Sequence, residues 1–416
     1  MKKGTAVFIL FWAAVHCAGA ADSANTDLAI VNAVIYPAPD APPVEQGSVL
    51  LHAGKIAAVG AGASVHVPDG TLVIDARGGA VLAGFWNSHV HILTPGLLHA
   101  ADRSAAELSL ELQRMFTRWG FTTVFDLASS LENTKILRHR IDDSEVVGPR
   151  ILTVGDPFFP EGGTPIYVKQ FLQENGFPSE EVSSPAQAEA RARRQLVDGA
   201  DGVKIFAGAI VGGKIGVLPM PLAIATAVVQ EAHRAGKPAF AHPTNREGIE
   251  ISIESGVDVL AHTAEMGPWD AELIRRLRAR NMALVPTLTL FADSMRKEGM
   301  SVVDIDKALA NHTQQVKAFA DAGGLILFGT DIGYIDVYDT SEEYRLLGRA
   351  LDFHQILASL TTNPAGRFAK GQKVGKLVAG ADADLVVLAG DPAHDIEELA
   401  RVRYTVGGGR VIFKAQ

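Results

Sequence analysis

The chain has 416 residues, of which 47% are hydrophobic and 20% charged, and its formal net charge is -9. This composition excludes a disordered or fibrous chain and suits one large domain with a small accessory module. Lysine and arginine are scattered along an acidic chain, which argues against nucleic acid as a partner.

The first 21 residues have the pattern of a secretory signal peptide. A lysine pair precedes an apolar run from Ala6 to Val15, and small residues follow it. The run is too short and wrongly flanked for a membrane span, so we expect no stable membrane anchor. Cleavage after Ala20 or Ala21 implies export to the periplasm or the cell exterior.

Cys17, the only cysteine, lies inside this segment. Its removal with the signal peptide leaves no thiol, which excludes disulfides and cysteine catalysis in the mature chain. Lipidation of Cys17 is the competing interpretation, although His16 before it matches poorly the small residue typical of such a site.

Both ends of the mature chain contain short β-type runs separated by Pro and Gly turns. Residues 22–78 and 374–416 therefore predict the two parts of one composite β-sandwich. The expected strands are Ala29–Ile35, Ser48–Leu51, Lys55–Val59, Leu72–Ile74, Asp384–Leu388, Val402–Val406 and Arg410–Phe413.

Residues 79–373 alternate short buried strands with amphipathic helices such as Leu222–Ala235, which is typical of a parallel sheet with crossover helices. Eight strand candidates predict an α/β fold, a closed (β/α)8 barrel of the TIM type. They are Val81–Phe85, Thr122–Asp126, Arg150–Val154, Gly202–Phe206, Pro238–Ala241, Val257–Ala261, Ala283–Val285 and Leu325–Phe328.

Polar residues of metal-binding type stand in or just after several of these strands, and the active site of such a barrel is built where its strands end. A lone histidine there is more often a hydrogen-bonded core residue, and a lysine inside an apolar strand usually means a wrong assignment. Their joint occurrence in chain order favours a metal site. The set is His89, His91, Lys204, His242, His262 and Asp331.

Four neutral imidazoles and one carboxylate suit borderline divalent ions such as zinc. Reaction of Lys204 with carbon dioxide would convert its amine into a carbamate with two anionic oxygens, which explains a buried lysine. Two ions about 3.5–4 Å apart would then share a hydroxide formed from a strongly acidified water.

This set resembles the amidohydrolase superfamily, in particular its imidazolonepropionase-like and Xaa-dipeptidase (prolidase-like) branch with a carboxylated lysine. The resemblance covers nearly the whole mature chain, including Thr362–Ala365 and Gly380–Leu388, which look like the family's closing segments. It implies that Asp331 also accepts the proton of the bridging water and passes it to the leaving nitrogen. The implied ligands are His89, His91 and Asp331 for one metal, His242 and His262 for the other, and carboxylated Lys204 as the bridge.

One position departs from the family pattern. The family often has an aspartate where this chain has Asn87, in the run Ala83–Asn87. Asn87 keeps a hydrogen-bonding side chain without the charge, so it weakens support around the ligands without removing a ligand.

Substrate selection is expected from the loops after the strands, two of which are glycine-rich covers at 161–165 and 207–213. The side chains that could grip a substrate carboxylate are Tyr167, Lys214, Arg246 and Tyr334.

Three functions stay open at this point. The leading one is hydrolysis of a C–N bond in a dipeptide, an N-acyl amino acid or a cyclic amide. The same site could instead hydrolyse an ester or lactone, or the barrel could be a catalytically silent scaffold. A small molecule or dipeptide is the expected partner, and a homo-oligomer stays open.

Overall fold

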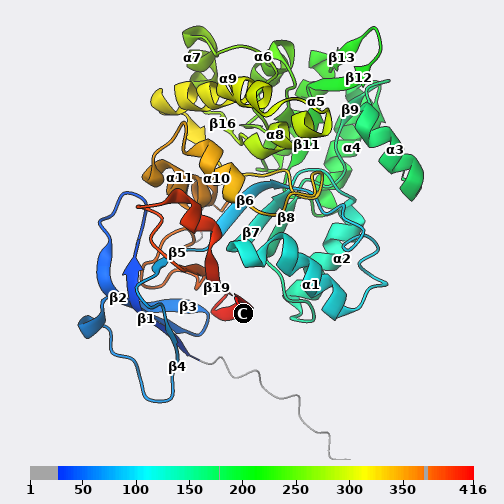
Figure 1. Ribbon diagram of the computed structural model, residues 1–416. Coiled ribbons are helices and arrows are strands. Elements are labelled where there is room, and N and C mark those ends of the chain that lie inside the picture. The colour runs from blue at the N-terminus through cyan, green and yellow to red at the C-terminus, as the bar shows by residue number, and fades with distance from the viewer. Residues whose placement is uncertain (1–26, 178, 370–372) are drawn as a thin grey trace, which may run out of the picture.

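The computed structural model describes residues 27–177, 179–369 and 373–416. The expected signal peptide and Cys17 lie outside the described residues. Within the described ranges, no helix is both long enough and apolar enough to cross a membrane. Figure 1 shows a β-rich part made from the two ends of the chain beside a larger part in which strands and helices alternate.

The two ends of the chain share one eight-stranded sheet, where the sequence predicted a composite β-sandwich. Its order is β20-β19-β18-β5-β1-β2-β3, and β4 pairs with β1. The strands are β1 (Leu28–Ile35), β2 (Val44–His52), β3 (Lys55–Ala61), β4 (Leu72–Asp75), β5 (Ala80–Ala83), β18 (Leu385–Leu388), β19 (Val402–Gly407) and β20 (Arg410–Lys414).

This sheet curls back on itself. Ile56 of β3 donates its backbone N–H to the carbonyl of Ala381 at 2.9 Å, although β3 and the segment leading into β18 stand far apart in the strand order. The curl encloses a separate apolar core that includes Ile30, Val49 and Leu385. The two chain ends therefore stabilise each other by burying one shared core.

Parallel strands form two further sheets, β6-β7-β8 and β11-β14-β15-β16-β17. Seven of the eight expected barrel strands are present with small shifts at their ends. The strands are β6 (Phe85–Val90), β7 (Phe121–Asp126), β8 (Arg150–Thr153), β11 (Val203–Phe206), β14 (Ala239–His242), β15 (Val259–Leu260), β16 (Ala283–Leu284) and β17 (Leu325–Ile326).

Backbone hydrogen bonds at two seams join these sheets into a closed ring. After β8, Phe158 donates to the carbonyl of Lys204 in β11 at 2.8 Å. At the other seam, Ser88 of β6 donates to Phe328 at 2.7 Å and Asp331 donates to His89 at 2.9 Å. The expected (β/α)8 barrel is confirmed, and the end of its last strand lies against its first strand.

The prediction for the first barrel strand was wrong. Residues Val81–Phe85 divide at Gly84, because β5 pairs with β1 and β18 of the composite sheet while the barrel strand β6 begins at Phe85. A Cβ at position 84 would lie 2.2 Å from Oγ1 of Thr122, so the chain can pass between the sheets only at a glycine. The expected domain boundaries near residues 79 and 373 stay predictions.

Helices cover the outside of the barrel and are joined by short additional elements (Figure 1). Those between or after the barrel strands are α1 (Ala105–Met115), α2 (Leu131–Asp142), α3 (Ile166–Asn175), α4 (Pro185–Val197), α5 (Leu222–Arg234), α6 (Arg246–Ser255), α7 (Ala271–Ala279), α8 (Leu288–Lys297), α9 (Val302–Asp321), α10 (Ser341–Leu347), α11 (Phe353–Leu360) and α12 (Thr362–Phe368). The short strands are β9 (Phe159–Pro160), β10 (Glu181–Val182), β12 (Gly208–Gly212) and β13 (Gly216–Pro219).

The glycine-rich segment 207–213 is not a plain loop. It forms β12, which pairs antiparallel with β13 and is tied to the barrel because Thr244 donates its hydroxyl to the carbonyl of Gly208 at 2.7 Å. Left-handed backbone at Gly212, Gly213 and Gly216 allows the tight hairpin. These glycines therefore form the turn of a hairpin.

Residues of a barrel strand alternate between the interior and the surrounding helices. In β11, Val203 and Ile205 belong to the outer core, whereas Lys204 between them points to the interior with 1% exposure. In β14, Phe240 belongs to the interior core, where it packs on Phe125 at a ring separation of 4.8 Å. Strand pleating therefore turns Lys204 toward the barrel axis.

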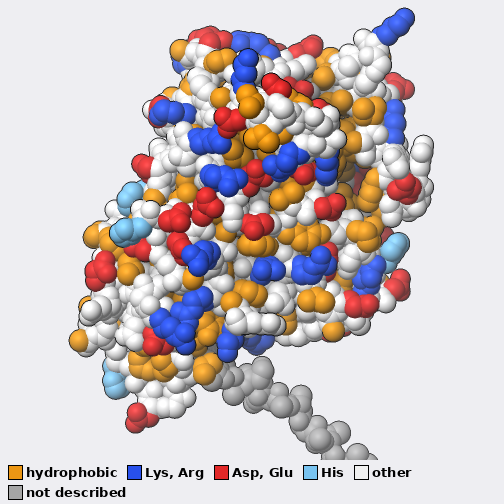
Figure 2. All heavy atoms as spheres, viewed as in Figure 1, with side chains coloured by type: hydrophobic (Ala, Val, Ile, Leu, Met, Phe, Trp, Pro, Cys, Tyr) orange, Lys and Arg blue, Asp and Glu red, His pale blue; other side chains and the backbone are white. Residues whose placement is uncertain are grey.

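Acidic and basic side chains are interspersed on the face shown in Figure 2. No single-sign stripe runs along that face.

Candidate metal centre

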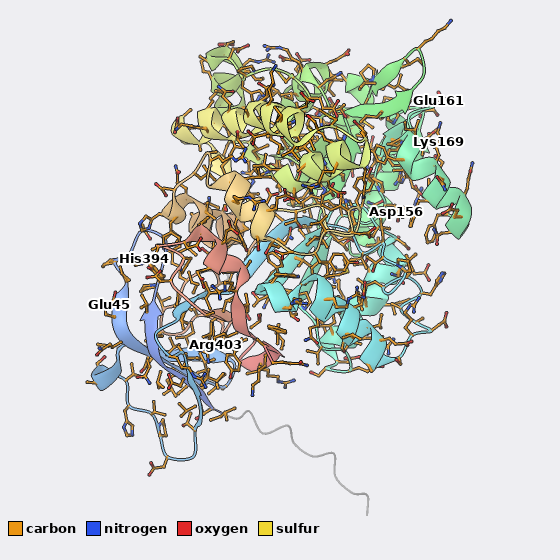
Figure 3. All side chains as sticks on the ribbon, in the orientation of Figure 1. Glu45, Asp156, Glu161, Lys169, His394 and Arg403 are labelled. Atoms are coloured by element: carbon orange, nitrogen blue, oxygen red, sulfur yellow. The ribbon has the colours of Figure 1, made fainter. Side chains whose placement is uncertain are left out.

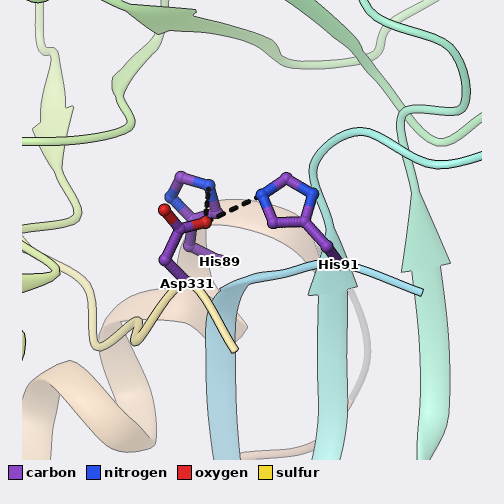
Figure 4. Close-up of side chains that lie close together, drawn as sticks. All are labelled: His89, His91 and Asp331. Carbon is purple, nitrogen blue, oxygen red and sulfur yellow. Dashed lines mark ion pairs between the residues drawn. The ribbon is translucent and has the colours of Figure 1, made fainter. Parts of the chain in front are cut away.

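His89, His91 and Asp331 meet at the open end of the barrel (Figure 4). Oδ1 of Asp331 lies 3.1 Å from Nε2 of His89 and 2.8 Å from Nε2 of His91. One potential ligand atom from each of the three lies within 4.8 Å of the others, and all three residues are buried. Nitrogen and oxygen donors this close can hold one divalent ion.

An unusual backbone holds Asp331 in place. Its φ is +63°, the left-handed region, which Asp and Asn tolerate better than most residues. Gly333 follows with φ +97°, and a Cβ there would lie 2.0 Å from the carbonyl oxygen of His91. The loop after the last strand is therefore pressed against the first strand, which brings the Asp331 carboxylate to the two histidines.

The remaining predicted ligands lie next to this group. The rings of His89 and His262 have centroids 4.6 Å apart, and those of His262 and His242 are also 4.6 Å apart. Lys204 and all five of the other residues line the same cavity. The structure thus brings together the whole predicted set, from strands far apart in the sequence.

Hydrogen bonds orient two of the imidazoles. Nδ1 of His91 lies 2.9 Å from the carbonyl oxygen of Ala128, which can only accept, so Nδ1 carries the proton. Nδ1 of His262 lies 2.7 Å from the hydroxyl of Thr287, whose own proton goes to the carbonyl of Pro286 at 2.8 Å. In both residues Nε2 keeps a free lone pair, which is the form that binds a metal.

Burial keeps these groups in ligand form. It lowers the pKa of His89 to about 4 and that of His242 to about 3, so both imidazoles are neutral near pH 7. Burial also lowers the pKa of Lys204 to about 8. Burial raises the pKa of Asp331, but its close interactions with His89 and His91 outweigh that effect and hold the pKa well below its usual range.

The donor set fits a metal. Both ring nitrogens of His89 and Oδ1 of Asp331 are buried and have no hydrogen-bond partner within the described residues. Leaving such polar atoms unpaired costs free energy, and a coordinated cation would remove that cost. Three histidine or carboxylate donors suit a divalent metal ion.

Two buried side chains next to the metal-binding residues, those of Asn87 and Asp126, hold neighbouring strand ends together. Asn87, the departure from the family pattern, donates to Oγ1 of Thr330 at 2.7 Å and accepts from the backbone of His89 at 3.2 Å. It therefore links the first and last strands without a charge. Asp126 at the end of β7 was missed by the sequence reasoning, although its place at a strand end was a usable signal.

Asp126 does not face the metal group. Its carboxylate accepts hydrogen bonds from Ser129 at 2.6 Å and from Thr153 at 2.7 Å. Burial raises its pKa, while these hydroxyls lower it. Asp126 therefore joins the second and third barrel strands, β7 and β8, through buried hydrogen bonds.

A cavity of about 840 Å³ opens above the metal group. Tyr167 and Tyr334 line it, with rings 5.3 Å apart, as expected for residues that contact substrate. Lys214 and Arg246 do not line it. Lys214 is exposed in the turn of the β12–β13 hairpin, and Arg246 is ion-paired with Asp270 at 2.9 Å.

A family model for the amidohydrolase family matches residues 80–412, which is most of the chain. The chain belongs to the amidohydrolase family. The barrel and the strand-end residues described above both lie within the matched range.

This amidohydrolase is similar over almost its full length to several known proteins. It is 21% identical to the imidazolonepropionase of Thermoplasma acidophilum over 405 residues, covering 89% of this chain and 90% of that protein. Among solved structures, an Xaa-Pro dipeptidase with bound methionine has a TM-score of 0.78 at 22% identity, covering 94% and 100% of the two chains. A putative prolidase from Bifidobacterium longum has a TM-score of 0.77 at 24% identity, covering 94% and 95%. The predicted resemblance to the imidazolonepropionase-like and prolidase-like branch is confirmed.

Thr287 offers a test of ligand orientation in this amidohydrolase. Thr287→Val keeps the shape and the branched Cβ but removes the acceptor for Nδ1 of His262, so we expect metal affinity to fall about 10–100-fold. Competition with a chelator measures that affinity. Thr313→Val, which loses only a hydroxyl contact within α9, is the matched control. Equal affinities in both variants would contradict the orienting role.

Glu343 of α10 offers a test of how the start of helix α8, directly after Thr287, is held. Its buried carboxylate accepts the backbone N–H groups of Leu288 at 2.9 Å and Thr289 at 2.7 Å, which open helix α8 directly after Thr287. Burial raises its pKa to about 7. Glu343→Ala leaves both N–H groups unpaired, so the free energy of unfolding should fall by about 2–4 kcal/mol.

The adjacent Glu342 gives the control for that experiment. It pairs with Arg296 at the surface, and Glu342→Ala should change the free energy of unfolding by at most about 1 kcal/mol. Urea unfolding of the two variants compares them directly. Equal losses would mean that Glu343 does not hold α8.

Proposed function

We propose that this amidohydrolase cleaves a C–N bond of a small amide, such as a dipeptide, an N-acyl amino acid or a cyclic amide. The observation that carries the proposal is the meeting of His89, His91 and Asp331 with unpaired buried donor atoms on the floor of a large cavity. The relatives named imidazolonepropionase and Xaa-Pro dipeptidase support the same bond type.

In the proposed site, His89, His91 and Asp331 would hold one divalent ion and His242 with His262 would hold the second. Lys204, on the interior face of β11, would supply two anionic oxygens to the ions once carbon dioxide has carboxylated it. The two ions, zinc by the preference of these donors, would lower the pKa of water and polarise the substrate carbonyl.

Asp331 carries the proton in this proposal. Its carboxylate takes the proton of the attacking water as the oxygen bonds to the carbonyl carbon. The C–N bond breaks, and Asp331 returns the proton to the leaving nitrogen. Tyr167 and Tyr334, which line the cavity beside this carboxylate, would position the substrate.

Metal analysis of the purified protein, grown with zinc and bicarbonate, tests the proposal first. We expect about two divalent ions per chain and turnover on a panel of dipeptides, N-acyl amino acids and cyclic amides. If the enzyme turned over lactones but no amide, its function would be ester hydrolysis and not C–N cleavage. A folded chain that binds no metal and cleaves nothing would refute the proposal.

We make a second, separate proposal, which is that the protein is exported. It rests on the signal-peptide pattern of residues 1–21. Mass spectrometry of the secreted protein should find a new N-terminus at residue 21 or 22. An uncleaved chain that stays in the cytoplasm would contradict it.

A further inference from the structure

The walls of the cavity differ from its floor. Much of the wall is apolar or aromatic, with contributions from the loop after β6, the start of α2, α3 and α8. The residues that matter most are Leu93, Leu131, Phe159, Phe171, Phe177 and Phe291. Such a wall suits a bulky apolar substrate group.

The charged residues on the wall are mostly acidic. Among the described residues, no arginine lines the cavity, and Lys135 is the one basic side chain besides Lys204 at the floor. The acidic set is Glu132, Asp156, Glu180, Asp198 and Glu265. A substrate carboxylate would therefore meet like charges, which oppose binding.

One nearby basic residue offsets part of this charge. Arg191 pairs with Glu180 at 3.0 Å from behind the wall, where its guanidinium stacks over Phe158, and this leaves the other four acidic residues of the set. Lys169 of α3 is exposed and does not line the cavity. Figure 3 labels Lys169 and the wall residue Asp156 on the same side of the molecule.

Glu265 is the acidic residue placed to contact a substrate near the floor. It follows His262 by three residues, lines the cavity and is exposed. Burial raises the pKa of the Tyr167 hydroxyl, and the charges of Tyr334, Asp331 and Glu265 add to that rise. Glu265 lines the same cavity as Tyr167 and Tyr334, so its carboxylate is available to a group bound in that cavity.

The backbone around Glu265 is held firmly. Its own N–H donates to the carbonyl of Thr244 at 2.7 Å. The fully buried side chain of Gln315 accepts from the N–H of Ala264 at 3.0 Å and donates to the carbonyl of Met266 at 3.1 Å. Partial desolvation of its carboxylate in the cavity raises the pKa of Glu265, and the charge of Glu298 raises it further.

We propose that this cavity selects amides that present an ammonium or uncharged polar group to Glu265 and a bulky apolar group to the aromatic wall, and disfavours a free carboxylate. This inference rests on the proposed C–N hydrolysis and narrows its substrate class. The place of Glu265 on the cavity wall, on a backbone held by hydrogen bonds, and the lack of arginine on the described wall carry it.

Binding of two matched probes to the metal-loaded enzyme tests the role of Glu265. We expect calorimetry to show that 2-phenylethylamine binds at least about tenfold more tightly than the uncharged 2-phenylethanol. Glu265→Gln should reduce that advantage to about twofold or less. Glu272→Gln, which removes an exposed carboxylate of α7 outside the cavity, should keep it. An advantage that survives Glu265→Gln, as coordination of the amine to metal would give, overturns the proposal.

A chromogenic series tests the same selection during turnover. Phenylalanine p-nitroanilide, its N-acetyl form and its N-succinyl form share one scissile bond and carry a positive, no and a negative charge. We expect kcat/KM to decrease in that order, with the succinyl form at least about tenfold below the acetyl form. Equal or faster cleavage of the succinyl form refutes the selection. Failure to cleave any of the three, together with intact amine selectivity, would count against the proposed C–N hydrolysis and leave the binding inference standing.

Discussion

Replacing Asp331 by asparagine is expected to lower turnover by about 10²–10⁴-fold while the protein stays folded. Asparagine tolerates the left-handed backbone at this position, where φ is +63°, so the loop should keep its shape. What is lost is a carboxylate that can take a proton, 3.1 Å from His89 and 2.8 Å from His91. Steady-state kinetics on the best substrate of the panel measures the change.

Thermal unfolding and metal content separate this effect from simple damage. Asp331→Asn should keep most of the metal, because the amide oxygen can still coordinate and the histidines are unchanged. A variant that turns over at the wild-type rate would rule out proton transfer by Asp331. A loss of rate that only matches a loss of metal would show that Asp331 acts as a ligand alone.

Replacing Lys204 by alanine is expected to lower both metal content and rate. Lys204 is 1% exposed and points to the barrel interior, where burial lowers its pKa to about 8 and so favours the neutral amine that reacts with carbon dioxide. Without the carbamate, two cations would share no bridging anion. We expect metal affinity to fall by more than about 100-fold.

Two further measurements sharpen the Lys204 experiment. Lys135→Ala, at the exposed part of the cavity wall, removes a lysine without touching the floor and should keep full metal content. A short-chain carboxylate added to Lys204→Ala should restore part of the activity, because its two oxygens can replace those of the carbamate. Unchanged metal content in Lys204→Ala would exclude the bridging assignment.

The strand-end rule named residues that the structure brings to one cavity, and it could do so because it uses local information. His89, Lys204 and His242 stand in buried strands whose alternation is visible in the sequence, and parallel strands of a barrel end at one face. The same rule did not predict that Asp126, also at a strand end, turns to Ser129 and Thr153 instead. Hydroxyl partners from other segments decided that orientation.

The first barrel strand shows a second feature that the sequence could not predict. Residues 80–90 form one nearly continuous buried run, and both β5 and β6 lie within it. A buried strand has the same apolar pattern in either sheet, so hydrophobicity cannot show where the chain passes from one to the other. Contact of Gly84 with Thr122 marks the point, and Thr122 belongs to another strand.

Residue identity and the local alternation of strand and helix were enough to predict the candidate ligands, the number of barrel strands and the association of the two chain ends. The lining of the cavity could not be predicted in this way: the folded chain leaves out Lys214 and Arg246 and includes Glu265. The physical reason is that cavity walls form between segments distant in sequence, and no local period encodes the distances between them.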